Sequence, residues 1–390
     1  MSRILVTGGA GFIGSHVVDR LLAAGHEPRI FDLRRSPYHR DVETVIGDVR
    51  AFEAVLAAVT GCKAIVHLAA AADVGEVARD PVAAEELNCR GTLSVLHAAR
   101  EGHVDRVLYA STIWVYSDVE ATHVDEETLL PAPSHVYTAT KLAGELYCRS
   151  YAQLYGVSST ILRFGIPYGP RARPGAVVPT FVGKALAGQP LLLAGGGTQA
   201  RRFVYVEDLA EGVVRALAPA AANRTFNLVG AEDVTIRQIA ETVREVVGSV
   251  EVIDVESRPG DFAGAQVSGL RAAEELDWRP QTPFAEGLRR YVEWHCGCAE
   301  TVTVSAVVAP AATGAVSPGA PGARRPLPWA RLIAFAVLGL LVGTLVVERD
   351  AVRDLEHVLG GRVLLTLIVA ALAFSALALT SARRRRVARS

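Results

Sequence analysis

A stretch near the start of the chain reads Thr7-Gly8-Gly9-Ala10-Gly11-Phe12-Ile13-Gly14-Ser15. The apolar residues 3–6 precede it as a predicted strand, and residues 12–24 follow it with the pattern of a helix. Glycines at positions 8, 11 and 14 allow a tight turn, a close backbone approach to a ligand and close packing of the helix on a sheet. The free N–H groups at the start of such a helix suit phosphate oxygens. The stretch therefore predicts a dinucleotide-binding turn.

A second apolar run, residues 27–31, ends in Asp32. An acidic residue at about this distance from such a turn accepts hydrogen bonds from an adenosine ribose. Because a carboxylate repels a 2′-phosphate, the expected cofactor is NAD, although Arg34 and Arg35 just past the strand leave NADP open. An ordinary glycine-rich turn is the alternative, and the combination of strand, helix and acid argues against it.

Short apolar runs and helical segments alternate along the first part of the chain. They span residues 43–46, 52–59, 64–67, 82–100, 106–110, 137–155 and 159–163. This alternation predicts an α/β fold with a Rossmann-type doubly wound parallel sheet over residues 1–169. Prolines and glycines then loosen the pattern, and residues 170–296 are expected to form a smaller α/β substrate-binding portion, interleaved with the first.

The charge distribution and the cysteine content limit which partners, metal sites and cellular compartments are expected. Residues 297–390 hold eleven arginines and five acids, which leaves residues 1–296 with about −7 of a total charge of −1. No basic stripe marks this main body, so no nucleic-acid partner is expected. Five scattered cysteines fit a reducing compartment. Cys296-Gly297-Cys298 has no second ligand pair, so incidental thiols are favoured over a redox role and no metal site is expected.

The composition changes after residue 296. Residues 297–328 are rich in Ala, Pro and Gly and predict a flexible linker. Residues 329–382 contain two apolar segments, 332–347 and 363–380, and are interpreted as a transmembrane helical hairpin, with a buried helical pair as the alternative. Arginines flank both ends, including the basic tail 383–390, so the positive-inside rule puts both ends in the cytoplasm. We expect a multi-pass protein of the cell membrane whose main body faces the cytoplasm, with the lipid bilayer as a partner.

Candidate catalytic residues follow from Tyr137-Thr138-Ala139-Thr140-Lys141. The phenol and the ammonium are four residues apart and share one face at the start of a helix. A lysine cation near a tyrosine favours the phenolate, which predicts that the pKa of Tyr137 falls toward a useful range. Thr112 ends a neighbouring strand, and its hydroxyl is expected in the same crevice. A chance Tyr-x-x-x-Lys on a helix is the alternative.

With these motifs, residues 1–295 resemble the extended short-chain dehydrogenase/reductase family, the group of NAD-dependent sugar epimerases and dehydratases. Further matching segments are Gly47-Asp48-Val49, His67-Leu68-Ala69-Ala70, Asn88-Cys89-Arg90-Gly91-Thr92, Val115-Tyr116, residues 201–208, Arg258-Pro259-Gly260-Asp261, residues 276–280 and Glu286-Gly287-Leu288.

The resemblance implies specific site residues. The implied NAD site consists of Gly8, Gly11, Phe12, Ile13, Gly14, Asp32, Asp48, Val49, Leu68, Ala69, Ala70, Asn88, Tyr137 and Lys141. The implied catalytic residues are Thr112, Tyr137 and Lys141. Thr112 would also bind the substrate, and Arg201 and Arg258 would grip the diphosphate of a nucleotide sugar.

Two departures from the family pattern narrow the expected reaction. Ile113 and Trp114 stand where the family's 4,6-dehydratases carry Asp-Glu and where its decarboxylases carry Glu at the second place. Neither side chain can move a proton, so oxidation and reduction at a carbinol remain. Ile166 stands where epimerases usually carry an Asn bonded to the substrate diphosphate.

The resulting expectation is a membrane-tethered, NAD-dependent nucleotide-sugar epimerase of the UDP-glucose 4-epimerase type, with a homodimer left open. One alternative is an NAD(P)-dependent dehydrogenase or reductase of a sugar, sterol-like or lipid-linked alcohol. The other is a non-catalytic cofactor-sensing protein at the membrane.

Overall fold

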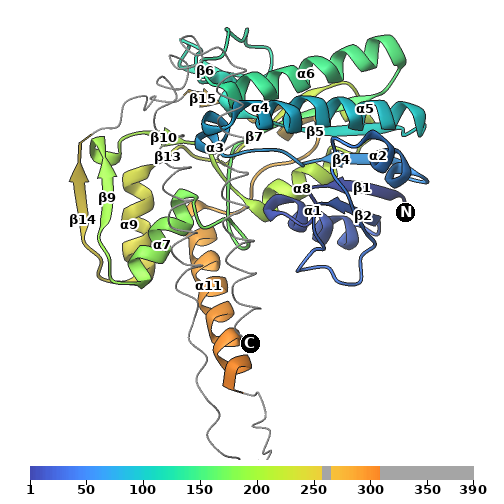
Figure 1. Ribbon diagram of the computed structural model, residues 1–390. Coiled ribbons are helices and arrows are strands. Elements are labelled where there is room, and N and C mark those ends of the chain that lie inside the picture. The colour runs from blue at the N-terminus through green and yellow to red at the C-terminus, as the bar shows by residue number, and fades with distance from the viewer. Residues whose placement is uncertain (257–264, 308–390) are drawn as a thin grey trace, which may run out of the picture. The chain divides into compact units, whose positions relative to one another are not determined.

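A seven-stranded parallel sheet forms the centre of the molecule, with the strand order β12-β7-β5-β4-β1-β2-β3 (Figure 1). The strands are β1 (Arg3–Thr7), β2 (Glu27–Asp32), β3 (Thr44–Ile46), β4 (Ala64–His67), β5 (Arg106–Thr112), β7 (Ser159–Phe164) and β12 (Thr225–Leu228). The chain runs outward from β1 in one direction and from β4 in the other. The turns after β1 and β4 therefore meet at a topological switch point, where sheets of this kind bind ligands.

The computed structural model describes residues 1–256 and 265–307, with side chains through residue 297. These residues form one compact unit. The expected doubly wound α/β fold is confirmed.

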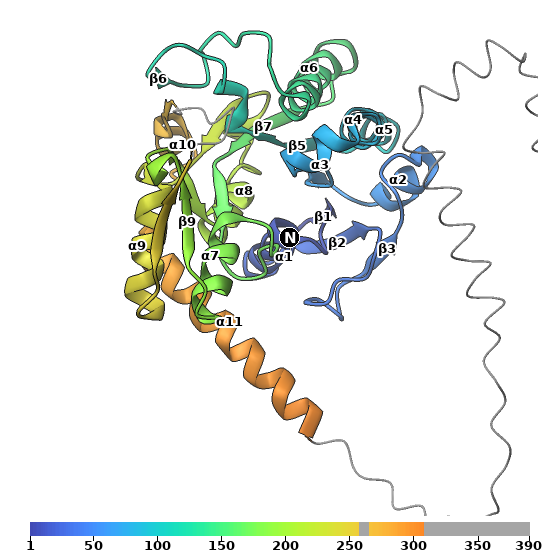
Figure 2. The same cartoon turned by 60° about the vertical axis from the view of Figure 1, so that its left-hand side comes forward.

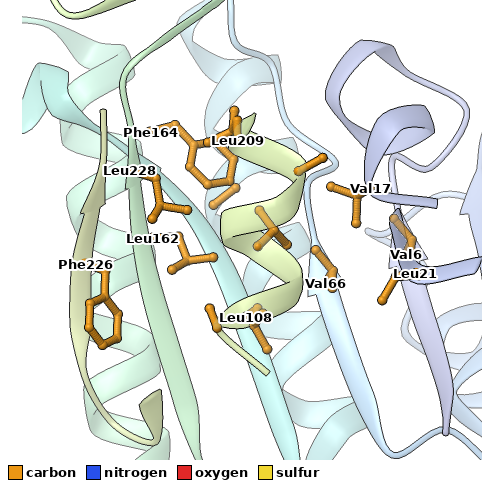
Figure 3. Close-up of a cluster of buried hydrophobic side chains, with 14 of the residues drawn as sticks. Val6, Val17, Leu21, Val66, Leu108, Leu162, Phe164, Leu209, Phe226 and Leu228 are labelled. Atoms are coloured by element: carbon orange, nitrogen blue, oxygen red, sulfur yellow. The ribbon is translucent and has the colours of Figure 1, made fainter. Parts of the chain in front are cut away.

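Helices cover both faces of the sheet. Against one face pack α1 (Phe12–Ala23) and α8 (Val206–Arg215), through the apolar cluster shown in Figure 3, which includes Val17, Leu21 and Leu209. Against the other pack α2 (Phe52–Val59), α5 (Gly91–Glu101) and α6 (Val136–Tyr155). Figure 1 shows α5 and α6 together, across the sheet from α1 and α8. The three-layer arrangement holds the strand ends rigidly.

Residues 170–296 contribute to two cores. Their helix α8, strand β12 and helix α10 (Leu270–Glu275) pack on or extend the central sheet. A second core joins α7 (Val177–Leu186), β9 (Leu191–Ala194), α9 (Ile236–Val247), β14 (Val252–Val255) and the start of α11 (Phe284–Val307); Figure 2 shows several of these elements side by side. The expected interleaving with residues 1–169 is therefore present.

Several short elements complete the fold. They are α3 (Val74–Arg79), α4 (Pro81–Glu85), η1 (Glu86–Arg90), η2 (Ile113–Tyr116), η3 (Gly195–Gly197), η4 (Pro219–Ala221), β6 (His123–Val124), β8 (Ile166–Tyr168), β10 (Ala200–Arg201), β11 (Phe203–Tyr205), β13 (Val234–Thr235) and β15 (Gln266–Val267). The helix predicted over residues 82–100 is not continuous, because the π-helical turn η1 interrupts it.

The expected linker start at residue 297 is wrong, because α11 continues through Val307. Residues 297–307 contain no proline, the residue that most strongly breaks a helix, although Gly297 and the Thr and Val residues among them have low helix propensity. Among residues 1–256 and 265–307, no helix is both long and apolar enough to cross a membrane. The rest of the expected linker, the hairpin 329–382 and the basic tail lie outside the described residues.

Candidate active site

The glycine turn lies directly against the loop that follows β4. Gly8 has φ +72°, and a Cβ there would lie 2.8 Å from the backbone nitrogen of Ala69. A Cβ at Gly14 would lie 2.2 Å from the carbonyl oxygen of Gly8. Only glycine allows the turn, the loop and α1 to approach this closely. This close backbone packing of strand, turn and helix is what a dinucleotide-binding turn requires.

The start of α1 offers backbone donors to a ligand. Its N-cap is Gly11, and within the described part of the chain no side chain caps this end and no acid lies in the first turn. The first helical positions, Phe12 and Ile13, therefore present N–H groups beside the partial positive charge of the helix dipole. This end of α1 suits a pyrophosphate.

Asp32, at the end of β2, lies beside the same turn. Its Oδ2 accepts a hydrogen bond from the backbone N–H of Ala10 at 3.1 Å, and its Oδ1 accepts one from Arg34 at 3.3 Å. The carboxylate is thus oriented where the sequence predicts a ribose contact. Asp48 lies farther out and binds the guanidinium of Arg50 at 2.6 Å, which lowers the pKa of Asp48, and Val49 is buried.

A buried histidine links the cradle to α5. The hydroxyl of Thr92 donates to the Asn88 carbonyl, so it accepts from Nε2 of His67 at 3.1 Å. Nδ1 of His67 then accepts from the Thr7 hydroxyl at 2.7 Å, and Thr7 in turn accepts from the N–H of Ala69 at 3.3 Å. Burial lowers the pKa of His67 to about 3, so the ring is neutral. The chain of bonds fixes the loop beside the glycine turn.

Asn88 has a structural role in addition to its expected cofactor contact, which stays a prediction. Its side chain is 1% exposed, its Oδ1 accepts from the N–H of Ala71 at 2.8 Å, and its Nδ2 donates to the Ala71 carbonyl and the Thr140 hydroxyl, each at 3.0 Å. Thr140 donates to the carbonyl of Tyr137. The π turn η1 aims Asn88 inward, where it ties the loop after β4 to α6.

The three predicted catalytic residues converge at the end of β5. Tyr137, in the first turn of α6, is 8% exposed and is hydrogen-bonded to Thr112, the last residue of β5. One helical turn later, Nζ of Lys141 donates to the carbonyl oxygen of Ala110 at 2.9 Å. The site therefore combines a phenol, a hydroxyl and an amine at one strand end.

The predicted direction of the Tyr137 pKa is wrong for this structure. Burial raises the pKa of Tyr137 to about 12, although the Thr112 hydrogen bond and the charge of Arg173 lower it in part. Burial also lowers the pKa of Lys141 to about 8. Lys141 is directed at Ala110 and lies over the ring of Tyr109, 5.3 Å from its centroid. Loss of water around both groups outweighs the benefit of placing them on one helix face.

The substrate side of the site is largely apolar. Ile113, Trp114 and Ile166 line a small cavity together with Arg201, which lies on β10. Arg258, the other predicted diphosphate contact, lies outside the described residues. Arg202 was not predicted for the site and lines the same cavity.

Arg202 is already engaged by the protein. Its Nη1 donates to the carbonyls of Gly230 at 3.2 Å and Ala231 at 2.8 Å, and its Nε lies 3.0 Å from a carboxylate oxygen of Asp233. A neighbouring cavity of about 590 Å³ shares Arg202 and Val267 with the first. These contacts give Arg202 a structural role. Arg201 is engaged as well, because its Nη1 donates to the carbonyl of Ala200 at 2.7 Å.

Residues 4–229, more than half of the chain, match the family described as the NAD dependent epimerase/dehydratase family. The chain belongs to this family. It is 32% identical over 311 residues to the UDP-glucose 4-epimerase of Mycolicibacterium smegmatis, a match that covers 75% of this chain and 98% of the relative.

Solved structures of the family agree with this assignment. UDP-glucose 4-epimerase of Thermus thermophilus in complex with NAD is 36% identical, with a TM-score of 0.70, and the match covers 76% of this chain and 99% of that one. A dTDP-glucose 4,6-dehydratase of Streptomyces venezuelae with NAD bound is 32% identical, with a TM-score of 0.71 and coverage of 75% and 97%. The protein is an NAD-dependent member of the family, and its glycine turn, uncapped helix start and Asp32 fit that cofactor.

Proposed function

We propose that this protein is a nucleotide-sugar epimerase of the UDP-glucose 4-epimerase type. A sugar carbinol loses a hydride and a proton, which leaves a ketone, and the ketone then regains both with the hydride on its other face. The oxidation and the reduction cancel, so no external reductant is consumed.

Each residue of the site has a task in this reaction. Tyr137 takes the hydroxyl proton and returns it, Thr112 positions the substrate oxygen, and Lys141 adds positive charge one turn along α6. Bound NAD would supply the hydride acceptor and donor for this exchange. The residues that would hold it are Gly8 and its turn at the pyrophosphate, Asp32 at the adenosine ribose and Lys141 at the nicotinamide ribose.

The apolar side chains of Ile113 and Trp114 are the main reason to propose epimerisation rather than dehydration. Both follow directly after Thr112, and both line the cavity beside Arg201. Loss of water from a sugar needs a second acid and base beyond Tyr137, and neither of these side chains can transfer a proton. This favours reversible oxidation over dehydration.

Incubation of the full-length protein with NAD and UDP-glucose tests the proposal. The expected product is the 4-epimer of equal mass, resolved by anion-exchange chromatography, with no net NADH. Parallel reactions with UDP-galactose and with dTDP-glucose test reversibility and the choice of base. A product lighter by one water would identify a dehydratase and refute the epimerase proposal.

A net dehydrogenase of an alcohol is the second candidate, because Ile113, Trp114 and Ile166 give the small cavity beside Arg201 a partly apolar lining. It would accumulate NADH in proportion to product. Arg201→Ala separates the two candidates. It should raise KM for a nucleotide sugar, whose diphosphate needs a cation, and should be nearly silent for a neutral alcohol.

For the C-terminal part, we propose on the sequence alone that residues 329–382 form a membrane hairpin that tethers the enzyme to the cytoplasmic face of the cell membrane. Two apolar segments with arginines on both outer flanks support it. A homodimer remains part of the proposal, to be tested by the molar mass of the protein in solution.

A further inference from the structure

An ion pair spans two loops at the edge of the active site. Arg173 lies between β8 and α7, and its Nη2 is 2.9 Å from Oδ2 of Asp73. Asp73 is the N-cap of α3, where its Oδ1 accepts a hydrogen bond from the N–H of Glu76 at 2.9 Å. The cap fixes the carboxylate, which forms the ion pair with the guanidinium.

The helix that begins at Asp73 packs on the catalytic tyrosine. Val77 of α3 is buried in one cluster with Tyr137 and Ala84, and Val74 and Trp114 pack against this cluster. Because Asp73 precedes Val74 directly, its ion pair brings Arg173 to the rim of the pocket that buries Tyr137. The positive charge of Arg173 acts on Tyr137, whose pKa is raised by burial and lowered in part by Thr112 and Arg173.

The other polar groups around Tyr137 do not supply a constant positive charge to it. They are uncharged at neutral pH, change their charge near neutral pH or contact other residues. On its own helix, Lys141 is directed at Ala110, and burial lowers the pKa of Lys141 to about 8, so its charge changes near neutral pH. His135 precedes α6 and contacts Trp114. From β5, Thr112 and the buried Tyr109 are uncharged at neutral pH. A guanidinium, in contrast, stays charged throughout.

We propose that Arg173 is a positioning residue for the reaction: its guanidinium supplies a constant positive charge near Tyr137 that stabilises the phenolate, and the carboxylate of Asp73 offsets part of that charge. The inference rests on the proposed function in one respect, namely that Tyr137 is the acid–base group.

Two charge changes in the same ion pair test it. Arg173→Met removes the cation, so it should move the acidic limb of the pH profile of kcat to higher pH. Asp73→Asn removes the anion and leaves the cation, so it should move the same limb to lower pH. Each shift should be roughly 0.3–1 pH unit, because the pair is half-exposed and partly screened. Arg173→Lys keeps the charge and should stay nearer to the wild-type profile than Arg173→Met.

The variants separate charge from structure. Asn is as good an N-cap as Asp, so Asp73→Asn retains the start of α3. A purely structural ion pair would be broken by both variants and would move the profile in the same direction or not at all. Either of those results would overturn the proposal.

A substrate-free measurement keeps this inference distinct from the proposed function. The Cζ signal of Tyr137 can be titrated by ¹³C NMR in tyrosine-labelled holoenzyme with NAD bound, and Tyr137→Phe assigns it. Opposite shifts of this titration in Arg173→Met and Asp73→Asn support the inference even if no nucleotide sugar is turned over. Coincident titrations in both variants and the wild type overturn it even if epimerase activity is found.

Discussion

At the scale of single residues, Tyr137 must give up a proton from a site that opposes the charge this creates. Its phenol is buried, and burial raises its pKa to about 12. The polar groups that oppose this effect are therefore part of the function, and each can be removed singly.

Tyr137→Phe should lower kcat by roughly 10²–10⁴-fold, the usual loss when a general acid–base group is removed. NAD affinity should stay close to wild type, since the ring that packs against Val77 is retained. Steady-state kinetics and a fluorescence titration with NAD measure the two quantities. Turnover equal to wild type would remove Tyr137 from the catalytic role.

The lowered pKa of Lys141 predicts that the free energy of unfolding depends on pH. Its pKa falls from 10.5 to about 8 on folding, so between these values the unfolded chain binds more protons and stability rises with pH. Relative to Lys141→Met, the wild type should gain on the order of 3 kcal/mol of unfolding free energy between pH 7 and pH 10.5. Urea denaturation of both proteins at several pH values measures this gain. A difference that does not change with pH would contradict it.

At the scale of elements, the π turn η1 and the strand end of β4 act together. His67 and Asn88 connect the glycine turn, the loop after β4 and α6 through buried hydrogen bonds. The cofactor cradle and the catalytic helix are therefore held by one network, and damage to it should affect both.

Thr92→Val removes the hydroxyl between His67 and Asn88 with little change in volume. It should lower the unfolding free energy by about 1–3 kcal/mol, because buried polar partners lose their bonds, and it should also weaken NAD binding. Thr92→Ser keeps the hydroxyl and is the matched control. Thermal unfolding and NAD titration of both variants check this; equal behaviour of Val and Ser would show that the hydroxyl is dispensable.

Features that depend on a short continuous segment could be predicted from the sequence, whereas features that depend on tertiary packing could not. The glycine turn, Asp32 and the Tyr137–Lys141 spacing lie in short continuous segments, so the doubly wound fold could be predicted from the sequence alone. The catalytic roles of Thr112, Tyr137 and Lys141 stay predictions. The π turn could not be predicted, because residues 82–100 contain no proline and a single glycine, Gly91, is tolerated within a helix. The Tyr137 pKa depends on burial, which no local pattern reports. Arg173 reaches the site only through the loop after β8, far from Tyr137 in sequence.

At the scale of the whole molecule, the proposed hairpin predicts membrane attachment. The full chain should remain in the membrane fraction after a high-salt wash, and a chain ending at Val307 should leave it, bind NAD and retain activity. A cysteine placed at Ser390 should resist labelling from outside intact cells. Salt extraction of the full chain would reduce the attachment to a peripheral contact, and external labelling would reverse the orientation.

The position of β12 also determines how the chain can fold during synthesis. β7 ends at Phe164, but its outer neighbour β12 begins only at Thr225. At 5–20 residues per second, β7 therefore waits roughly 3–12 s on the ribosome with an open edge. An unpaired edge of a buried, apolar strand invites pairing with other chains. The nascent chain is therefore expected to be most prone to aggregation in this interval, and a ribosome that stalls between the two strands would release an aggregation-prone fragment.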